Sequence, residues 1–207
     1  MTHDVEDEHA APGWDAIDAA LSLLYPGVEP RHVGYLPPAA FSANLQGCSS
    51  YPAAGHWHYV TYGLSELYTP GPDDDREWSG WGFELTLRVV RGSEDEAPGW
   101  PFTVLNHLAN FINGQGVLVE DGHRMDLRQP VTGHPHTDGP DTGLTVFAFT
   151  VDPQLDTIDT PNGKVTFYQA VGVTPEEKTR MQQASTRQVL DQMTGSNPLL
   201  VTDPARA

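Results

Sequence analysis

The most informative segment of the chain is His56-Trp-His-Tyr-Val-Thr-Tyr-Gly-Leu-Ser-Glu-Leu-Tyr68. Its first half is rich in β-branched and aromatic residues, which favour strands. Because side chains alternate between the two faces of a strand, both histidines share one face, and Trp57 and Tyr59 share the other. Both faces carry large groups. The segment therefore predicts a strand at residues 56–63.

The sequence on either side predicts more strands and three helices. Apolar residues at helical spacing begin at Trp14 and end before Pro26-Gly27. The run Thr174-Pro-Glu-Glu177 is a capping box, which starts a helix. We expect helices at 14–24, 101–114 and 174–193, and strands near 33–36, 83–89, 144–151, 164–173 and 199–202. Because strands and helices do not alternate regularly, the pattern indicates the α+β class, here a mixed or antiparallel β-sheet flanked by helices.

Two further patterns concern exposure and loops. In the strand at 83–89, apolar residues alternate with Glu84, Thr86 and Arg88. This alternation predicts a half-buried strand with its polar side chains on the opposite face. Residues 28–54 are rich in proline, glycine and serine, and apart from a short strand near 33–36 they predict irregular loop.

The charge of the chain restricts its partners. It carries 28 acidic against 11 basic residues, a formal charge of -17, with acids bunched at 4–8, 73–75 and 94–96. Binding to nucleic acid or anionic lipid usually needs clustered lysine and arginine, so we expect neither as a partner. The acids form either a solvated coat that confers solubility or a negative face that steers a basic protein partner.

Length and cysteine content indicate the domain organisation and the cellular compartment of the protein. The 207 residues fit a disordered acidic leader at 1–12, one domain at 13–203 and a tail at 204–207. The single cysteine, Cys48, excludes an intrachain disulfide. No apolar run is typical of a secretory signal or a membrane span, so the sequence predicts a cytoplasmic protein.

His56 and His58 invite a metal interpretation. Two imidazoles on one side of a strand can share a cation, and Glu84 on the next strand could supply a carboxylate ligand. A metal-dependent enzyme centred on these three residues would also need an open position for water. The alternative is that the rings pack in the sheet and hydrogen-bond to backbone or acidic groups. The sequence leaves both interpretations open.

No other pattern supports catalysis or a cofactor. Cys48 has no neighbouring sequence that identifies an activated thiol, and the pair His134 and His136 falls in a loop. A Gly-x-Ser-x-Gly elbow and the glycine-rich phosphate-binding motifs are both absent from the sequence. We therefore expect no catalytic residue and no cofactor.

Four segments, taken in their order and spacing, resemble the suppressor-of-fused domain from Gly13 to about Thr202. The segments are the opening helix ending Leu24-Tyr-Pro26, the segment at 56–68, Gly82-Phe-Glu-Leu-Thr-Leu-Arg88 leading to Trp100-Pro101, and Thr160-Pro-Asn-Gly-Lys-Val-Thr-Phe167 with Val171-Gly-Val173 and Glu176-Glu177. The resemblance implies a domain that binds other proteins rather than a catalyst.

The resemblance also implies a binding surface and a role. The positions that match the peptide-binding side of the animal domains are Phe111, Val119 and His123, of which only Phe111 keeps the aromatic character. Compact bacterial relatives look like stand-alone immunity proteins that neutralise toxins, a role that needs surface complementarity rather than catalytic groups. The alternatives are the metal-dependent enzyme and a self-associating scaffold module.

Overall fold

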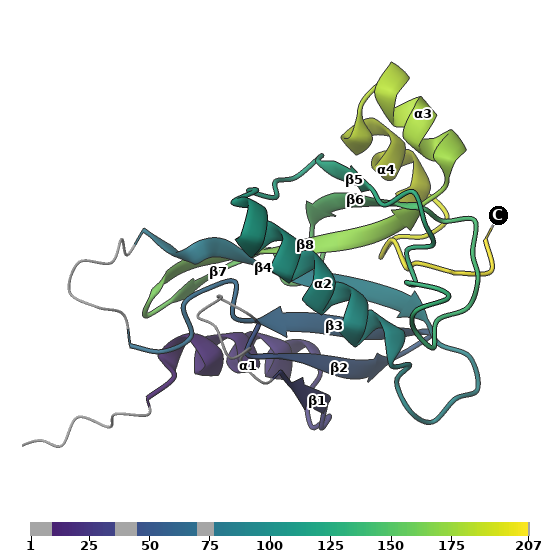
Figure 1. The fold of residues 1–207 in the computed structure, drawn as a ribbon. Coiled ribbons are helices and arrows are strands. Elements are labelled where there is room, and N and C mark those ends of the chain that lie inside the picture. The colour runs from purple at the N-terminus through teal and green to yellow at the C-terminus, as the bar shows by residue number, and fades with distance from the viewer. Residues whose placement is uncertain (1–9, 36–44, 70–76, 207) are drawn as a thin grey trace, which may run out of the picture.

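One mixed sheet forms the centre of the molecule (Figure 1). The computed structural model describes residues 10–35, 45–69 and 77–206. The strands are β1 (Arg31–Gly34), β2 (Gly47–Ala53), β3 (His56–Tyr62), β4 (Trp78–Val90), β5 (Arg124–Asp126), β6 (Val146–Val151), β7 (Thr157–Thr160) and β8 (Gly163–Val173). Their order is β1-β2-β3-β4-β8-β6-β5, and β7 also pairs with β8. Strands β4 and β8 are parallel and the other strand pairs antiparallel, which confirms the predicted α+β class with a mixed sheet.

In the described part of the chain, four helices cover this sheet. They are α1 (Pro12–Leu24), α2 (Trp100–Gln115), α3 (Pro175–Gln183) and α4 (Thr186–Thr194). Both α1 and α2 have proline in their first turn, where its missing N–H costs no hydrogen bond. Helix α2 ends at Gly116, whose left-handed φ of 63° suits glycine, and this turn directs the following loop toward β5. The predicted helices at 14–24 and 101–114 are thus confirmed.

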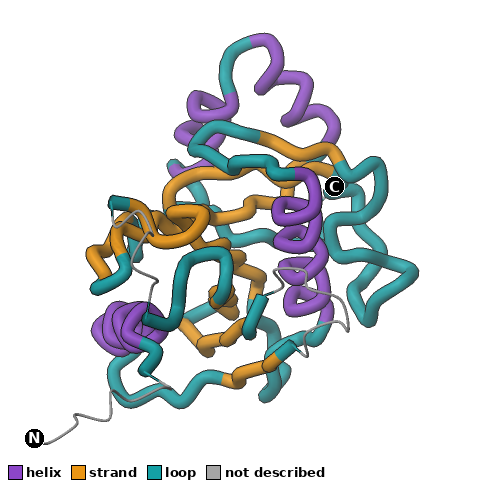
Figure 2. The backbone as a smooth tube through the Cα atoms, turned by 60° about the vertical axis from the view of Figure 1, so that its left-hand side comes forward, coloured by secondary structure: helices purple, strands orange, loops and turns teal. Residues whose placement is uncertain are grey.

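Neighbouring residues on β3 show how the two faces are covered. Tyr59 packs in the apolar cluster that includes Leu105 of α2. Val60 packs in a second cluster with Ile17 and Leu21 of α1. Because successive side chains point to opposite faces, α1 and α2 lie on opposite sides of the sheet, as Figure 2 shows.

The face under α1 is divided in two. Phe167 of β8 packs in the cluster beneath α1, whereas Val171, farther along the same strand, packs with Met181 of α3 and Leu190 of α4. Between them lies Gln169, which is polar and fully buried. A buried polar strip therefore separates two apolar clusters on this face.

The burial of strand β4 differs from the prediction. Its polar side chains Glu84, Thr86 and Arg88 are fully buried instead of facing solvent, so the strand is buried on both faces. Polar and apolar side chains alternate along β4 as predicted, but the polar face is an internal layer. Each of these side chains has hydrogen-bond partners inside the fold, which offset part of the cost of burial.

Among the described residues, three strands lie where the sequence pattern predicts none. Strand β2 occupies part of the region expected to be loop, and its Pro52 and glycine start weaken the strand signal. Strands β5 and β7 are only three and four residues long, too short to show a period. Five predicted strands are present in the described part of the chain: β1 lies near 33–36, while β3, β4, β6 and β8 lie close to their expected positions.

The C-terminal part differs from the prediction in two ways. The single helix expected at 174–193 is two helices, because Ser185 has extended backbone and caps the start of α4 by accepting a hydrogen bond from the Gln188 amide. The expected edge strand at 199–202 is an isolated bridge, in which Thr202 pairs in parallel with Val89 of β4. This segment therefore contributes little to the sheet itself.

Several expectations concern the chain ends and the acidic runs. Helix α1 begins at Pro12, within the expected leader, while residues 1–9 lie outside the described residues. The acidic runs at 4–8 and 73–75 and the last residue of the expected tail also lie outside them. Among the helices that the structure describes, none is long and apolar enough to cross a bilayer.

Candidate functional site

The two histidines of β3 lie on the same face of the sheet, as predicted, but each is held by structural contacts. The His58 ring is fully buried, and its Nδ1 lies 2.8 Å from the Tyr25 hydroxyl. The His56 Nδ1 lies 3.3 Å from the backbone oxygen of Ala54. Both rings therefore act as parts of the interior rather than as an open binding site.

Arg88 is the centre of the buried polar strip. Its guanidinium donates to both carboxylate oxygens of Asp152, at 2.6 and 3.0 Å, and also to the side-chain oxygens of Gln169 and Gln154. Gln169 in turn donates to the backbone oxygens of Leu199 and Leu200. This Arg88 network joins β4, β8, the turn after β6 and the C-terminal segment.

Burial and charge set the protonation of this network. Burial, and then the neighbouring positive charge of Arg88, lower the pKa of His58 to about 4, so the ring is neutral near pH 7. Burial acts to raise the pKa of Asp152, but His58 and Arg88 outweigh it and hold the pKa below its usual value. Since His58 is neutral, we assign the balancing positive charge to Arg88. The His58 Nε2 lies 3.3 Å from Asp152 Oδ2 without the alignment of a hydrogen bond.

Glu84 has a separate structural role. Its carboxylate accepts hydrogen bonds from the Thr61 hydroxyl (2.6 Å), the Gly63 amide (2.8 Å), and the Ser65 amide (2.9 Å) and hydroxyl (2.7 Å). Burial raises its pKa, and these four donors act in the opposite direction. Glu84 thus holds the turn that follows β3 against β4.

The structure does not bring together His56, His58 and Glu84, the candidate metal ligands of the alternative interpretation. His58 pairs with Arg88 across β3 and β4, and Glu84 lies four residues from Arg88, about 13 Å along an extended strand. Within the described ranges, no three histidine, cysteine or acidic side chains come close enough together to hold a metal ion. The second pair is separated from this region, and the His134 Nδ1 lies 3.3 Å from the backbone oxygen of Gly139.

The three positions implied by the resemblance lie together at the C-terminal end of α2 and in the loop that follows. Phe111 is 46% exposed. His123 is exposed, and its Nε2 lies 3.4 Å from a carboxylate oxygen of Glu120. Val119 is buried in the cluster under α2 and shows only 3% of its surface. Phe111 and His123 are therefore available to a partner, whereas Val119 mainly supports the loop.

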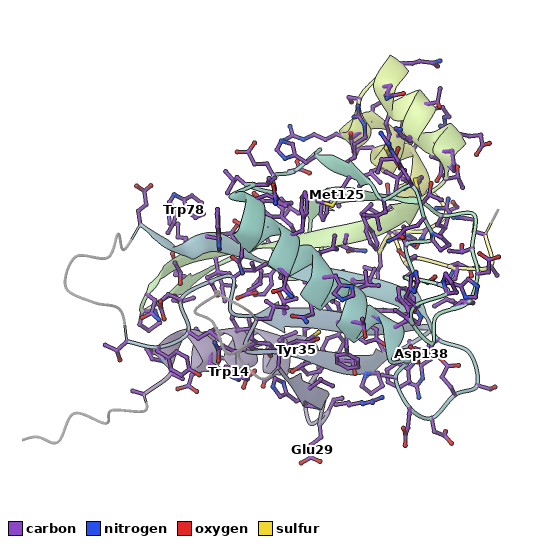
Figure 3. The ribbon with its side chains drawn as sticks, in the orientation of Figure 1. Trp14, Glu29, Tyr35, Trp78, Met125 and Asp138 are labelled. Atoms are coloured by element: carbon purple, nitrogen blue, oxygen red, sulfur yellow. The ribbon has the colours of Figure 1, made fainter. Side chains whose placement is uncertain are left out.

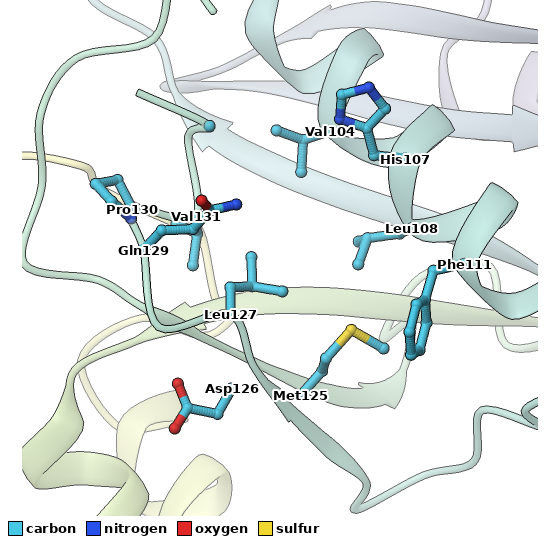
Figure 4. Close-up of a pocket in the computed structure, with 11 residues that line it drawn as sticks. Val104, His107, Leu108, Phe111, Met125, Asp126, Leu127, Gln129, Pro130 and Val131 are labelled. Atoms are coloured by element: carbon cyan, nitrogen blue, oxygen red, sulfur yellow. The ribbon is translucent and has the colours of Figure 1, made fainter. Parts of the chain in front are cut away.

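A groove of about 320 Å³ separates α2 from β5 (Figure 4). Val104, Leu108 and Phe111 of α2 face Met125 and Leu127 across it. Its wall is mostly apolar, and strand β5, the last in the strand order, forms one side. A groove of this kind suits an apolar side chain of a partner.

Two exposed apolar residues that the sequence pattern does not single out line a second pocket, which shares Met125 with the groove. Val117 is 39% and Leu118 47% exposed, directly after the end of α2. The available signal was the run of three apolar residues at 117–119 after a helix-ending glycine, since a loop cannot readily bury all three. We call Phe111, Val117 and Leu118, together with the groove beside them, the α2–β5 surface.

Comparison with known proteins places this geometry in a family. A sequence model described as Suppressor of fused protein (SUFU) matches residues 42–207. The chain belongs to the suppressor of fused family. It is 33% identical over 167 residues to the human Suppressor of fused homolog, a match that covers 73% of this chain and 32% of the human protein. This suppressor of fused chain thus spans about a third of the length of that relative.

Solved structures share the fold of the suppressor of fused chain. A chain of the Sufu-Fu complex crystal structure is 28% identical, with a TM-score of 0.83 over 96% of this chain and 92% of that chain. A SUFU homolog from Neisseria gonorrhoeae is 14% identical, with a TM-score of 0.62 over 93% of this chain and 94% of that chain. The second likeness shows a shared fold.

The contacts explain what the suppressor of fused signature does in this chain. The segments at 56–68 and 82–88 meet where Glu84 holds the turn at 63–65 and where Arg88 lies opposite His58. Both sets of contacts are buried. Glu84 and Arg88 of these segments therefore maintain the fold.

Proposed function

We propose that the chain is a non-catalytic domain that binds another protein through the α2–β5 surface. The observation that carries this proposal is the exposure of Phe111, Val117 and Leu118 beside a strand at the edge of the sheet. Large apolar side chains exposed together are typical of interfaces, whereas single ones are common on any surface. Glu84 and Arg88 of the segment that carries the resemblance are fully buried, so they are not part of this surface.

Strand β5 offers a second means of binding. In the described part of the chain it has a neighbouring strand, β6, on one side only. An edge strand presents unpaired backbone groups that can accept an extended segment of another protein. Such a segment would lie next to the groove, where one of its apolar side chains could enter.

The family supports protein binding in general terms. The relative in the Sufu-Fu complex is, as its description says, part of a complex with Fu. This chain spans about a third of the length of the human relative. The activity and partners of that whole protein are therefore not assigned to this chain. The charge of -17 favours a basic partner, since opposite potentials accelerate encounter.

A bacterial immunity protein of the cytoplasm fits these properties. Neutralising a toxin requires tight coverage of its surface rather than chemistry, and an acidic domain with an apolar surface can provide it. Co-expression with the toxin encoded next to this chain should restore growth of the host. If no neighbouring product is toxic, or if growth is not restored, the immunity role is wrong, although protein binding can still hold.

Paired substitutions test the surface. Leu118→Asp places a charge in the α2–β5 surface, and Leu23→Asp is a matched control because Leu23 is 86% exposed on α1. Native lysate should yield a protein that the wild type and the Leu23→Asp variant capture and the Leu118→Asp variant does not. Circular dichroism should show both variants folded.

Two outcomes would contradict the proposal. One is that no protein is captured at low or at physiological salt. The other is that Leu118→Asp and a second variant, Phe111→Asp, capture as much partner as the control, since both side chains are exposed in the same region. Light scattering on the purified chain provides a further check, because a self-associating scaffold would occupy this surface with a second copy.

A further inference from the structure

An aromatic pocket of about 400 Å³ lies beside the α2–β5 surface. It is formed by the start of β4, the middle of β8 and the loop after α2. Figure 3 shows Trp78 at this end of the sheet, near the C-terminal end of α2. The rings that line the pocket belong to Trp78, Trp81, Phe83 and Tyr168, and Glu120 lies on its edge.

An irregularity in β4 brings the two tryptophans together. Because Trp78 and Trp81 are three residues apart, a regular strand would direct them to opposite faces. The pairing of β4 with β8 shifts between Trp78 and Phe83, and in this stretch Gly80 and Gly82 have φ values of 57° and 79°. Such a bulge redirects side chains, so both indoles line one pocket.

The rings are held in place before any ligand arrives. The Trp81 indole donates to the Asn113 side-chain oxygen at 2.6 Å. The Phe83 and Tyr168 ring centroids are 5.5 Å apart, with the planes tilted by 58°. Trp78 is 45% exposed, so part of its ring remains accessible from solvent. A pre-organised pocket loses less conformational entropy on binding.

The electrostatic surroundings of the pocket are negative. Burial raises the pKa of Tyr168, and the charges of Glu120 and Asp121 raise it further, while Arg187 acts in the opposite direction. Asp121 has a partner, because its carboxylate lies 2.6 Å from Arg187. Glu120 faces His123 at 3.4 Å, and both of these side chains are about half exposed. The carboxylate of Glu120 therefore remains accessible at the edge of the pocket.

The same chain shows what such a combination binds. Beyond the other end of β4, the Arg91 guanidinium lies 4.4 Å from the Trp57 ring centroid, and Glu94 accepts a hydrogen bond from the Trp57 indole. An indole beside a carboxylate thus binds a guanidinium within the molecule. Among the described residues, the two cations stacked on rings are Arg91 and Arg31, which lies over Phe102 near the start of α2. Neither is at the aromatic pocket.

We propose that the aromatic pocket binds an arginine side chain of a basic protein partner. This proposal rests on the proposed protein-binding function, since it names the partner chemistry recognised next to the α2–β5 surface. The faces of the indoles attract the cation, Glu120 adds a carboxylate, and a planar guanidinium stacks on rings better than an ammonium does. The net charge of -17 attracts the same class of partner from a distance.

A titration tests the pocket without the natural partner. The probe is N-acetylarginine methylamide, added to the full chain labelled with ¹⁵N, and the indole signals of the five tryptophans are followed by NMR. The citrulline and norleucine derivatives are matched probes, because the first is neutral with a similar shape and the second is apolar. The Trp78 and Trp81 signals should shift saturably, while the signal of Trp57 should change little.

Two variants locate the effect. Trp78→Leu should weaken the binding of the arginine probe about 2- to 30-fold, the range of a cation–π contact. Glu120→Gln should weaken it as well, and the citrulline probe should bind more weakly than the arginine probe by a similar factor. Tyr68→Leu is a control, because Tyr68 is an aromatic residue that is 46% exposed and does not line the pocket.

The outcomes separate this proposal from the preceding one. Equal binding of the arginine and citrulline probes, tighter binding of the norleucine probe, or no saturable shift would each overturn it. None of these results would affect the capture experiment with Phe111→Asp, because Phe111 does not line the aromatic pocket, whereas Leu118 lines it as well as forming part of the α2–β5 surface. Conversely, failure to capture a partner would leave binding of the arginine probe unchanged.

Discussion

Arg88 on β4 and Asp152 after β6 form a fully buried ion pair with two parallel hydrogen bonds of 2.6 and 3.0 Å. Removing two charges from water is costly, so such a pair adds little net stability. Loss of one partner, however, leaves the other charge buried and uncompensated. The pair therefore favours one arrangement of β3, β4 and β8 over alternatives.

The first prediction concerns this pair. Asp152→Asn should lower the free energy of unfolding by about 3–5 kcal/mol, because Arg88 stays buried without its counter-charge. Urea denaturation at pH 7 measures the loss. The control is the double variant Arg88→Met with Asp152→Asn. Its loss in free energy of unfolding should be smaller than the sum of the losses in the two single variants. Strict additivity would contradict the coupling.

The second prediction concerns pH. The pKa of His58 is lowered to about 4 by burial, so the unfolded chain, with a histidine pKa of about 6.5, binds the proton more readily. Its contribution to stability is complete above pH 6.5 and is lost as the pH falls toward 4, by about 3 kcal/mol in all. The lowered pKa of Asp152 acts only below about pH 3.9, the value of an exposed aspartate.

Urea denaturation from pH 7 to 4.5 measures this dependence. His58→Gln should flatten it, because this variant lacks the buried ring that takes up a proton when the chain unfolds. The stability of the His58→Gln variant will still depend on pH to some extent, since burial also lowers the pKa of His32 and of His56. An unchanged slope in the His58→Gln variant would show that its ring is not the buried base.

The third prediction concerns the turn held by Glu84. Ser65→Ala removes one donor and should cost about 1–3 kcal/mol of stability. Glu84→Gln should cost more, because an amide N–H would then face donors at 63 and 65. Hydrogen exchange of the Gly63 and Ser65 amides should accelerate in both variants. Protection equal to the wild type would refute this role.

The fourth prediction concerns association with the partner. Because opposite charges steer encounter, the association rate should fall at least about tenfold between roughly 20 and 500 mM salt. The dissociation rate should change little, since apolar contacts hold the complex. Stopped-flow fluorescence gives both rates. An association rate that does not depend on salt would assign the acidic surface to solubility alone.

The sequence predicted the elements with a clear period and missed those without one. Strand β3 and helix α2 carry large side chains at regular spacing, and both lie where expected. Strands β5 and β7 are too short for any period, and β2 contains Pro52. The break between α3 and α4 depends on the capping of one residue, Ser185, within an otherwise helical pattern.

The candidate site was predicted less completely, because it depends on contacts between residues that are far apart in the sequence. The choice between a metal and a structural role for His58 depends on Tyr25 and Asp152, which are 33 and 94 positions away along the chain. Buried polar layers and exposed polar faces give the same alternation, so Arg88 could not be placed from its strand alone. Phe111 was implied by the resemblance, and its exposure follows from where α2 ends.

The contacts of residues 199–202 affect how the chain completes its folding during synthesis. Gln169 donates to the backbone oxygens of Leu199 and Leu200, and the Thr202 amide donates to the backbone oxygen of Arg88. A ribosome must therefore translate almost every codon of the domain, and release these residues from its exit tunnel, before the interior can close. Until then, β4 and β8 lack contacts that the finished molecule provides. Chaperone protection of the nascent chain would matter most in that interval.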